Sequence, residues 1–377
     1  MKRSLFKAFM LAAALIAAAP ALAENVAGAP AATPLAKPAK GAAPEHAVAG
    51  VLKTFKDWTL GCDNGLACIA IGFGLDPDAM SGYVRISRDG DADAAVAVTF
   101  TTWPDDRGTR LQAPTIRLAL DGNKAGGVPA GALPAERGDD VVTLALPATA
   151  VADFVLALRS AKRLTMQLAD GGKIVGSQTI SLNGSSAALL SMDDTQKRIG
   201  TVTALASPGP ARADTIAPPP DLPVVTSLPV GAMADPLPGA PRTAARPSSD
   251  CMEGTPPYVA FSLPQGASLW GACASTGAYN FAYDFRLFVG GKAGRPWSFV
   301  VPGVKPDDPI WLWNTYVDDD TKTLNSGFRG RGLGDCGDAT VWAFDGQDFA
   351  ALEYRAMGDC RGVLQSDWPV LYRARAR

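Results

Sequence analysis

Histidine is almost absent from this chain. Its 377 residues include one histidine, His46, and this residue lies in an Ala/Pro-rich stretch. Histidine is the usual general base near neutral pH and the commonest zinc ligand. We therefore exclude a Ser-His-Asp triad, a Cys-His pair and a His-containing metal site from the folded domains, and we expect no cofactor.

The chain also lacks clustered positive charge and a second long apolar run. Its formal net charge is −2, and loss of the three positive charges in its first 23 residues would move this to about −5. A mildly acidic surface argues against non-specific binding of nucleic acid. No later segment is apolar enough to span a membrane, so we predict no membrane span once the leader is cleaved.

Residues 1–23 are typical of a signal peptide. Lys2, Arg3 and Lys7 precede the apolar run 8–19, and the small-x-small sequence at 21–23 suits signal peptidase. An uncleaved membrane anchor is the alternative. We predict a periplasmic or secreted protein, in an oxidising compartment where paired cysteines become disulfides.

Six cysteines occur as three short-range couples, and no Cys-x-x-Cys pair is present. The even number and the export signal predict disulfides rather than zinc ligands. Crossing the long linker would require a larger loop closure, so we expect bonds between nearest neighbours. The predicted bonds are Cys62–Cys68, Cys251–Cys273 and Cys336–Cys360.

Two Pro-rich stretches divide the rest of the chain. Residues 24–50 form an Ala/Pro tether that we expect to be disordered, and residues 206–250 form a linker of polyproline type. Two globular domains are therefore expected, at 51–205 and 251–377.

The first domain is predicted to be α+β, with a β-rich body and about two helices. Strand-like runs occupy 51–60, 68–73, 82–88, 95–102, 115–120 and 141–146. Asn64-Gly65 predicts a hairpin turn, because both residues tolerate positive φ. Apolar spacing predicts a helix from Pro147, and a second helix is expected from Ser185 to Arg198.

The second domain is predicted to be antiparallel and all-β. Large apolar residues alternate over 279–287, as one buried face of a strand requires. Runs at 310–317 and 323–328 flank an acidic turn, and runs at 339–344 and 349–357 flank an Asp-Gly turn. Cys336 and Cys360 lie just outside the second hairpin, so antiparallel pairing would bring them together.

At these residues the chain resembles a known family. Gly332-Leu333-Gly334-Asp335-Cys336-Gly337, Val341–Gly346, Cys360-Arg361-Gly362 and Trp368-Pro369 are similar to the C-terminal signature of domain of unknown function 1176. Phe55–Trp58 with Cys62 and Cys68 fits the start of that family. With Ser181–Gly184, this part also loosely resembles the invasion-associated locus B group. The resemblance implies an exported two-domain protein and carries no established activity.

Two apparent ligand motifs fail on physical grounds, and a third is better explained as a turn. Residues 332–337 match a dinucleotide pattern by letters, but β-prone residues follow where a helix is required. The calcium-like run from Asp89 has Ala94 in place of glycine and Phe100 in place of glutamate. Asp318-Asp319-Asp320 is interpreted as a turn, with weak calcium binding as the alternative.

Carboxylates and aromatic residues leave two alternatives open. Asp335, Asp338, Glu353 and Asp359 could serve a glycosidase only if two of them converge across a sugar. Trp311 and Trp313 share one strand face and form either part of the core, which we favour, or a sugar-stacking platform.

Our candidate recognition surface is the glycine-rich loop from Gly327 to Gly337. Arg329 and Arg331 could grip a carboxylate or phosphate, although ion pairs with nearby aspartates are the explanation that we favour. The predicted binding residues are Arg329, Arg331, Asp335 and Trp342, with no catalytic or metal-binding residue. We expect a non-catalytic envelope protein that binds another protein or an envelope polymer. A carboxylate-dependent hydrolase of cell-wall glycans and an inhibitor of a lytic enzyme are the alternatives.

Overall fold

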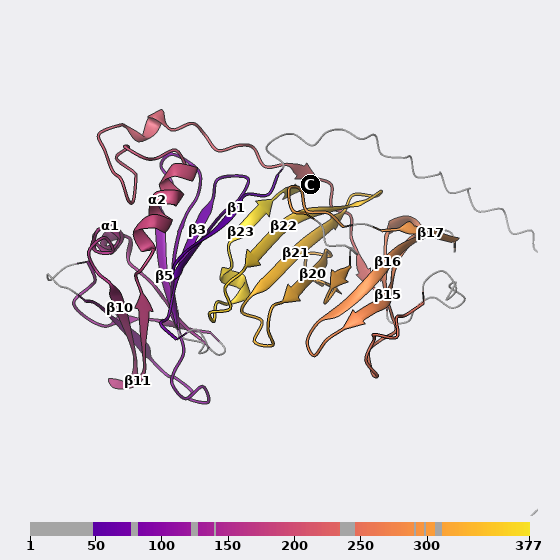
Figure 1. Cartoon of the computed structure of the whole chain (residues 1–377), viewed down its shortest axis with the longest axis horizontal. Helices are drawn as coiled ribbons and strands as arrows, with labels where there is room; N and C mark the ends of the chain where they lie inside the picture. The colour runs from indigo at the N-terminus through magenta and orange to yellow at the C-terminus, as the bar shows by residue number, and fades with distance from the viewer. Residues whose placement is uncertain are drawn as a thin grey trace, which may run out of the picture. The chain divides into compact units, whose positions relative to one another are not determined.

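The computed structural model describes residues 48–76, 82–121, 127–138, 141–233, 246–289, 292–297, 299–305 and 311–377. The predicted signal peptide, His46 and Ile310 lie outside these residues. The described chain is mostly antiparallel sheet with two α-helices, which confirms the predicted β-rich fold class (Figure 1). No helix in these ranges is long and apolar enough to cross a membrane.

The N-terminal half contains a seven-stranded sheet and a four-stranded sheet. Strand order in the first is β1 (Val51–Phe55), β2 (Trp58–Cys62), β3 (Cys68–Phe73), β4 (Tyr83–Arg88), β5 (Val96–Thr102), β9 (Val142–Ala145) and β8 (Glu136–Arg137). The second runs β11 (Lys173–Ser181), β10 (Arg163–Asp170), β6 (Pro114–Leu120) and β7 (Leu133–Pro134). The helices are α1 (Ala148–Ala157) and α2 (Ser185–Thr195).

One core joins the sheets and helices of this half. Phe100 of β5 meets Phe154 of α1 edge to face at 5.4 Å, and Leu164 and Met166 of β10 are fully buried. Burial of such side chains contributes roughly 1.5–3 kcal/mol each. The predicted hairpin at Cys62–Cys68 forms, but its positive φ falls on Leu66 and not on Asn64 or Gly65. The reason is that the loop is longer than a two-residue turn, since Cys62 pairs with Cys68. Within it the Asp63 carboxylate accepts hydrogen bonds from the backbone amides of residues 65 and 67.

A buried ionic network closes the N-terminal half. The Arg88 guanidinium donates to Asp193 at 2.8 Å, and both side chains are at most 1% exposed. Asp193 also accepts the backbone amides of residues 205 and 206. Arg198, likewise fully buried, donates to the carbonyl groups of Gly90, Asp91 and Ala92. The calcium-like loop is therefore held by a guanidinium group through its backbone.

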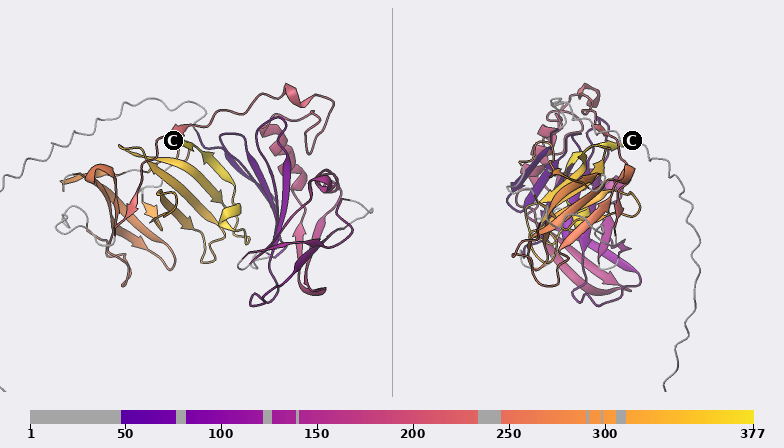
Figure 2. Two further views of the ribbon diagram at one scale, coloured as in Figure 1. Left: turned by 180° about the vertical axis from the view of Figure 1, so that it is seen from behind. Right: turned by 90° about the vertical axis from the view of Figure 1, so that its right-hand side faces the viewer.

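The C-terminal half consists of two sheets. The first runs β13 (Gly231–Ala232), β14 (Tyr258–Ser262), β15 (Ser268–Thr276), β16 (Phe281–Val289) and β17 (Lys292–Pro296), with β18 (Leu312–Trp313) also paired to β16. The second runs β19 (Tyr316–Val317), β20 (Leu324–Arg329), β21 (Gly337–Phe344), β22 (Phe349–Met357) and β23 (Val370–Arg373). Figure 2 shows these orange and yellow strands from behind. The predicted strand 310–317 is interrupted, because Asn314 has φ 49°.

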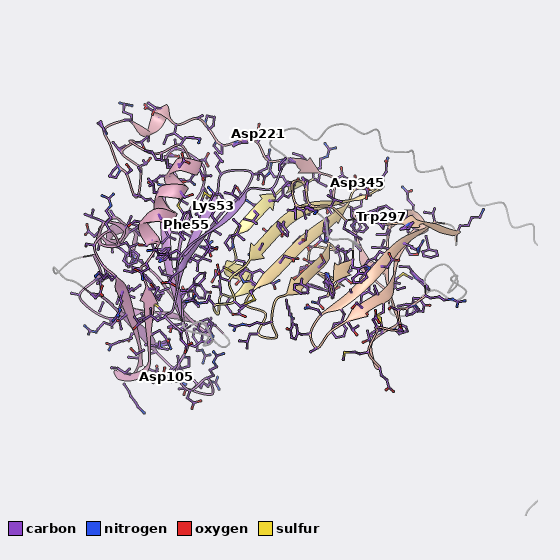
Figure 3. The ribbon with its side chains drawn as sticks, viewed as in Figure 1. Lys53, Phe55, Asp105, Asp221, Trp297 and Asp345 are labelled. Atoms are coloured by element: carbon purple, nitrogen blue, oxygen red, sulfur yellow. A yellow bond between two sulfur atoms is a disulfide. The ribbon has the colours of Figure 1, made fainter. Side chains whose placement is uncertain are left out.

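An aromatic core fills the space between these two sheets. Trp297, labelled in Figure 3, meets Phe349 edge to face at 6.1 Å. Phe299 contacts both Trp342 and Phe349, and Leu324 is fully buried beside them. The three predicted disulfides, Cys62–Cys68, Cys251–Cys273 and Cys336–Cys360, are all present.

The two halves also share a buried contact surface. Ile71, Phe73, Tyr83 and Trp103 from the N-terminal half pack with a C-terminal group that comprises Cys336, Met357, Val363 and Trp368. Polar bonds surround this cluster: Thr59 donates to Asp359 at 2.5 Å. The C-terminal loops that carry these residues are therefore held against the N-terminal sheet.

Part of the predicted linker 206–250 has regular pairing. It contains η1 (Ala213–Thr215) and β12 (Val224–Val225), which pairs in parallel with β24 (Arg375–Ala376). Val230 is 1% exposed and belongs to the C-terminal core. The division into two domains and a linker stays a prediction, and these contacts identify which linker residues pack.

Candidate functional site

An open hollow of about 460 Å³ lies over strands β19 to β22. Because side chains alternate along a strand, Asn325 and Arg329 of β20 point to the face opposite Leu324, which belongs to the aromatic core. We call this site the outer-face hollow. Its lining residues include Tyr316, Asn325, Phe328, Arg329, Glu353, Arg355, Gln365 and Ser366.

Arg329 is the exposed cation of the outer-face hollow. Its backbone is fixed by Asn280, whose side chain donates to the Arg329 carbonyl at 2.8 Å and accepts the Arg329 amide at 3.0 Å. Within the described part of the chain, its guanidinium group makes no hydrogen bond or ion pair. A fixed backbone with an uncommitted guanidinium suits recognition of an anionic group.

The opposite wall of the hollow is an ion pair. The Arg355 Nε atom donates to Glu353 at 2.5 Å, and its Nη1 atom donates to the Ser366 carbonyl at 2.6 Å. Their side chains are 27% and 28% exposed, so both can still meet a ligand. Tyr316, at 58% exposure, adds an aromatic face, whereas the Phe328 ring lies on the strand face of Leu324 and meets Trp313. The hollow thus combines an aromatic face, amides and both signs of charge.

The N-terminal half supports this wall through η3 (Gln365–Asp367). The Tyr83 hydroxyl donates to Asp367, and Arg85 lies 3.9 Å from the same carboxylate. Burial raises the pKa of Tyr83, and the negative charge of Asp367 raises it further. The phenol therefore stays protonated and keeps donating, which holds Gln365 and Ser366 in place.

Arg331 and Asp335 form a structural ion pair beside the hollow. Arg331 donates to both carboxylate oxygens at 2.8 and 2.7 Å, and the Gly362 amide donates to Asp335 at 2.6 Å. Burial opposes ionisation of Asp335, but these bonds outweigh it and place the carboxyl pKa below its ordinary value. With the Cys336–Cys360 disulfide, the pair fastens two loops together.

Trp342 lies under the hollow and not on its surface. It is 3% exposed, and its indole nitrogen donates to the Ser326 hydroxyl at 2.8 Å. It lines a separate hollow of about 180 Å³ on the inner face, together with Trp311 and Trp313. Of the four predicted binding residues, Arg329 alone lines the outer-face hollow, so this hollow does not bring the four together.

Trp311 and Trp313 are half-buried and packed against other aromatic residues. Their rings meet at 70° with centroids 6.0 Å apart, and Trp313 meets Phe328 at 75°. A sugar-stacking platform requires open ring faces, whereas these rings cover one another edge to face. The arrangement favours a packing role for the pair.

The carboxylates considered for hydrolysis lie in different settings. Asp335 is bound to Arg331, Glu353 to Arg355, and Asp359 to Thr59. Asp338 lines the inner hollow. Glu353 lines the outer-face hollow, on the other side of the sheet from Asp338. The glycine motif at 332–337 leads into strand β21, as expected, and Asp318 accepts the turn amides of residues 320 and 321.

The two N-terminal motifs of the family resemblance, Phe55–Trp58 and Ser181–Gly184, pack against each other. Asp57 accepts a hydrogen bond from the Ser181 hydroxyl at 2.6 Å, and the Trp58 indole donates to the Ser181 carbonyl at 3.0 Å. A side chain on Gly184 would meet the Phe55 carbonyl at 1.8 Å, so glycine is required there. These motifs therefore fasten α2 to the first hairpin.

Sequence reasoning missed Tyr316, Asn325, Arg355 and Gln365 as lining residues. A signal was present, because polar residues at 325, 329, 353 and 355 occupy alternate positions of strands whose other faces pack inward. No local pattern indicates that Gln365 and Ser366 of η3 line the hollow. Their position depends on the hydrogen bond between Asp367 and Tyr83, which are 284 positions apart in the sequence.

Comparison with known proteins gives the family. The chain is 29% identical over 351 residues to a protein of Escherichia coli (strain K12) named "Uncharacterized protein YpfG", across 86% of this chain and 93% of the relative. No solved structure matches this chain. The family profile described as "Protein of unknown function (DUF1176)" matches residues 52–375, and thus spans both halves. The chain belongs to this family, as its C-terminal signature predicts.

Proposed function

We propose that this protein is exported and binds an envelope polymer, without catalysis, through the outer-face hollow. The observation that carries the proposal is the uncommitted, backbone-anchored Arg329 in a hollow that also exposes Tyr316. A volume of about 460 Å³ suits a small ligand or one segment of a polymer. Aromatic faces and amides suit sugars, and a guanidinium suits the carboxylates that envelope polymers carry.

Localisation is part of the same proposal. Three disulfides fit an oxidising compartment and thus support a periplasmic or secreted location. The signal peptide that would direct export is our prediction from the sequence. The Pro-rich linker and the looser likeness of residues 55–184 to the invasion-associated locus B group also stay predictions.

Co-sedimentation with purified peptidoglycan sacculi tests the function. We expect wild-type protein to pellet with sacculi and Arg329→Ala to lose about tenfold in affinity, since a charge-assisted hydrogen bond contributes about 1.5–3 kcal/mol. Binding should also weaken as salt is added. The variant should unfold within about 1 kcal/mol of wild type, because Arg329 is exposed.

Arg375→Ala is the matched control, because it removes an exposed arginine of the same half that does not line the hollow. An equal loss of affinity for sacculi in both variants would show that only the net charge of the protein matters, and it would rule out the outer-face hollow as the binding site. Failure of the wild type to pellet would reject the polymer and direct the search to a protein partner by crosslinking. Release of soluble sugar fragments would select the hydrolase, and protection of sacculi from an added lytic enzyme would select the inhibitor.

A further inference from the structure

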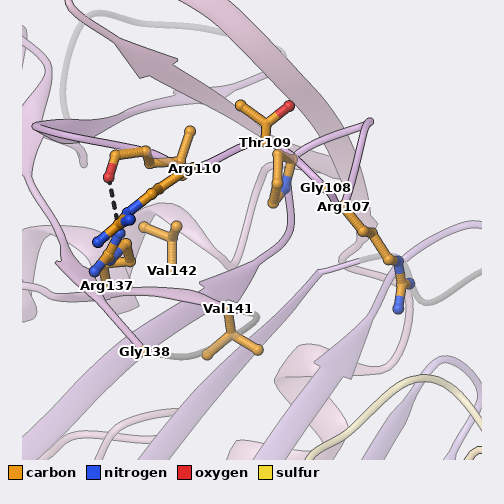
Figure 4. Close-up of a pocket in the computed structure, with 10 residues that line it drawn as sticks. Arg107, Gly108, Thr109, Arg110, Arg137, Gly138, Val141 and Val142 are labelled. Atoms are coloured by element: carbon orange, nitrogen blue, oxygen red, sulfur yellow. Dashed lines mark hydrogen bonds between the residues drawn. The ribbon is translucent and has the colours of Figure 1, made fainter.

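A second hollow, of about 370 Å³, lies in the N-terminal half and is rich in arginine. Arg107, Arg110 and Arg137 line it, together with Pro104, Gly108, Thr109, Leu111, Gly138, Val141 and Val142 (Figure 4). No carboxylate is among the described lining residues. It is remote in sequence from the outer-face hollow and shares no lining residue with it.

Two of these arginines converge. Figure 4 shows the side chains of Arg110 and Arg137 ending next to each other, while Arg107 points away. Arg137 donates through Nη1 to the Leu111 carbonyl at 3.1 Å. In the described ranges Arg110 makes no hydrogen bond or ion pair. Two neighbouring cations, of which only Arg137 has a partner and that partner is an uncharged carbonyl, repel each other, and an anion between them would relieve that repulsion.

The backbone beneath both side chains is well anchored. The Asp170 carboxylate accepts the amides of Gln112 and Ala113, at 3.1 and 2.7 Å, just after the Arg110 segment. Leu111 is 3% exposed and belongs to the N-terminal core. Arg137 ends β8, where it pairs with the buried Val142 of β9. A rigid scaffold that presents paired guanidiniums is the arrangement that binds oxyanions bidentately.

We infer that Arg110 and Arg137 form a binding site for a phosphate-class oxyanion. Arg107 takes no part, because its guanidinium group lies over the Trp103 ring at 5.8 Å. The anion can belong to a soluble phosphate or to a lipid headgroup. Both sources offer the same phosphoryl oxygens, and the two probes below separate them.

Titration calorimetry with inorganic pyrophosphate tests the site on the full-length exported chain. We expect saturable binding that weakens with salt, and at least a tenfold loss in Arg110→Gln and in Arg137→Gln. Glutamine retains an N–H donor for the Leu111 carbonyl but carries no charge. Arg117→Gln is the matched control, because Arg117 is exposed in the same half and donates Nη1 to the Ala130 carbonyl at 3.2 Å. Thermal unfolding of each variant verifies that it is folded.

A second arm uses vesicles of phosphatidylcholine with and without phosphatidic acid. Binding to anionic vesicles that depends on Arg110, alongside weak pyrophosphate binding, assigns the lipid headgroup; the reverse assigns a soluble phosphate. Equal losses in the Arg117 control would overturn the inference. Asp139 and Asp140 follow Gly138 in the sequence. If wild type binds neither probe and Asp139→Asn with Asp140→Asn creates binding, those carboxylates neutralise the arginines and the inference is wrong.

Discussion

The N-terminal half buries an ion pair in its interior, whereas the C-terminal half has an aromatic core and ion pairs whose arginines are partly exposed. Arg88 and Asp193 are almost fully enclosed, and each has further polar partners. In the C-terminal half the ion pairs Arg331–Asp335 and Arg355–Glu353 keep their arginines about one quarter exposed. Buried pairs are costly to break, and partly exposed pairs are less so. The charges of the C-terminal half are therefore more available for binding.

The largest expected effect comes from breaking the interior pair. Asp193→Asn leaves the enclosed Arg88 guanidinium without its counter-charge, and loss of one partner from a buried pair costs about 3–5 kcal/mol. Urea unfolding followed by tryptophan fluorescence measures the change. Asp194→Asn is the control, because Asp194 is 68% exposed and its pair with Lys197 spans 3.9 Å. A loss below about 1 kcal/mol in Asp193→Asn would show that the network is not important for stability.

The disulfides should have a somewhat smaller effect, graded by loop length. Replacing Cys336 and Cys360 with alanine opens a loop with a sequence separation of 24, for which chain entropy gives a loss of about 3.5 kcal/mol. The Cys62–Cys68 bond closes a separation of 6, and its removal should cost about 2.4 kcal/mol. Melting curves of the two double variants test the order. The reverse order would show that packing around the bonds outweighs loop entropy.

The smallest effect is expected at the partly exposed pair. Asp335→Asn should cost about 1–3 kcal/mol at neutral pH, since two hydrogen bonds to a charged group are weakened. The folded-state pKa of Asp335 is lowered, so its stabilisation is fully present above the unfolded pKa, near 3.9, and is lost as pH falls through the folded value. Unfolding free energies measured from pH 5 down to pH 2.5 should converge for wild type and variant. Parallel curves would contradict this linkage, and Asp320→Asn, at an exposed turn position, is the control.

Local patterns predicted much of this fold. The run predicted at 349–357 beside the Asp-Gly turn coincides with β22, and the apolar spacing after Pro147 corresponds to α1. Strands β10 and β11 were missed although Leu164, Met166 and Leu168 alternate with polar residues, so the signal was present. Asn314 interrupts a predicted strand because its positive φ is set by tertiary hydrogen bonds to Asn280 and Gly327.

The candidate site was less predictable than the fold. Alternation places Arg329 on a strand face, but it does not reveal that Arg331, two residues later, meets Asp335 and Gly362. The difference depends on the path of the loop that Cys336–Cys360 closes, which local propensity does not encode. The wall at Gln365 and Ser366 depends on Tyr83, and thus on packing between the halves.

The surface shared by the halves has a consequence for how the chain acquires its structure. Its polar bonds connect residues far apart in sequence, 284 positions for Tyr83–Asp367 and 300 for Thr59–Asp359. Synthesis proceeds from the N-terminus, so the first sheet is complete while Phe73 and Trp103 still lack their cover. Contacts between residues so far apart in the sequence form slowly, and apolar surface that stays uncovered in the meantime promotes aggregation. A nascent chain that stops before Cys336 leaves that face uncovered.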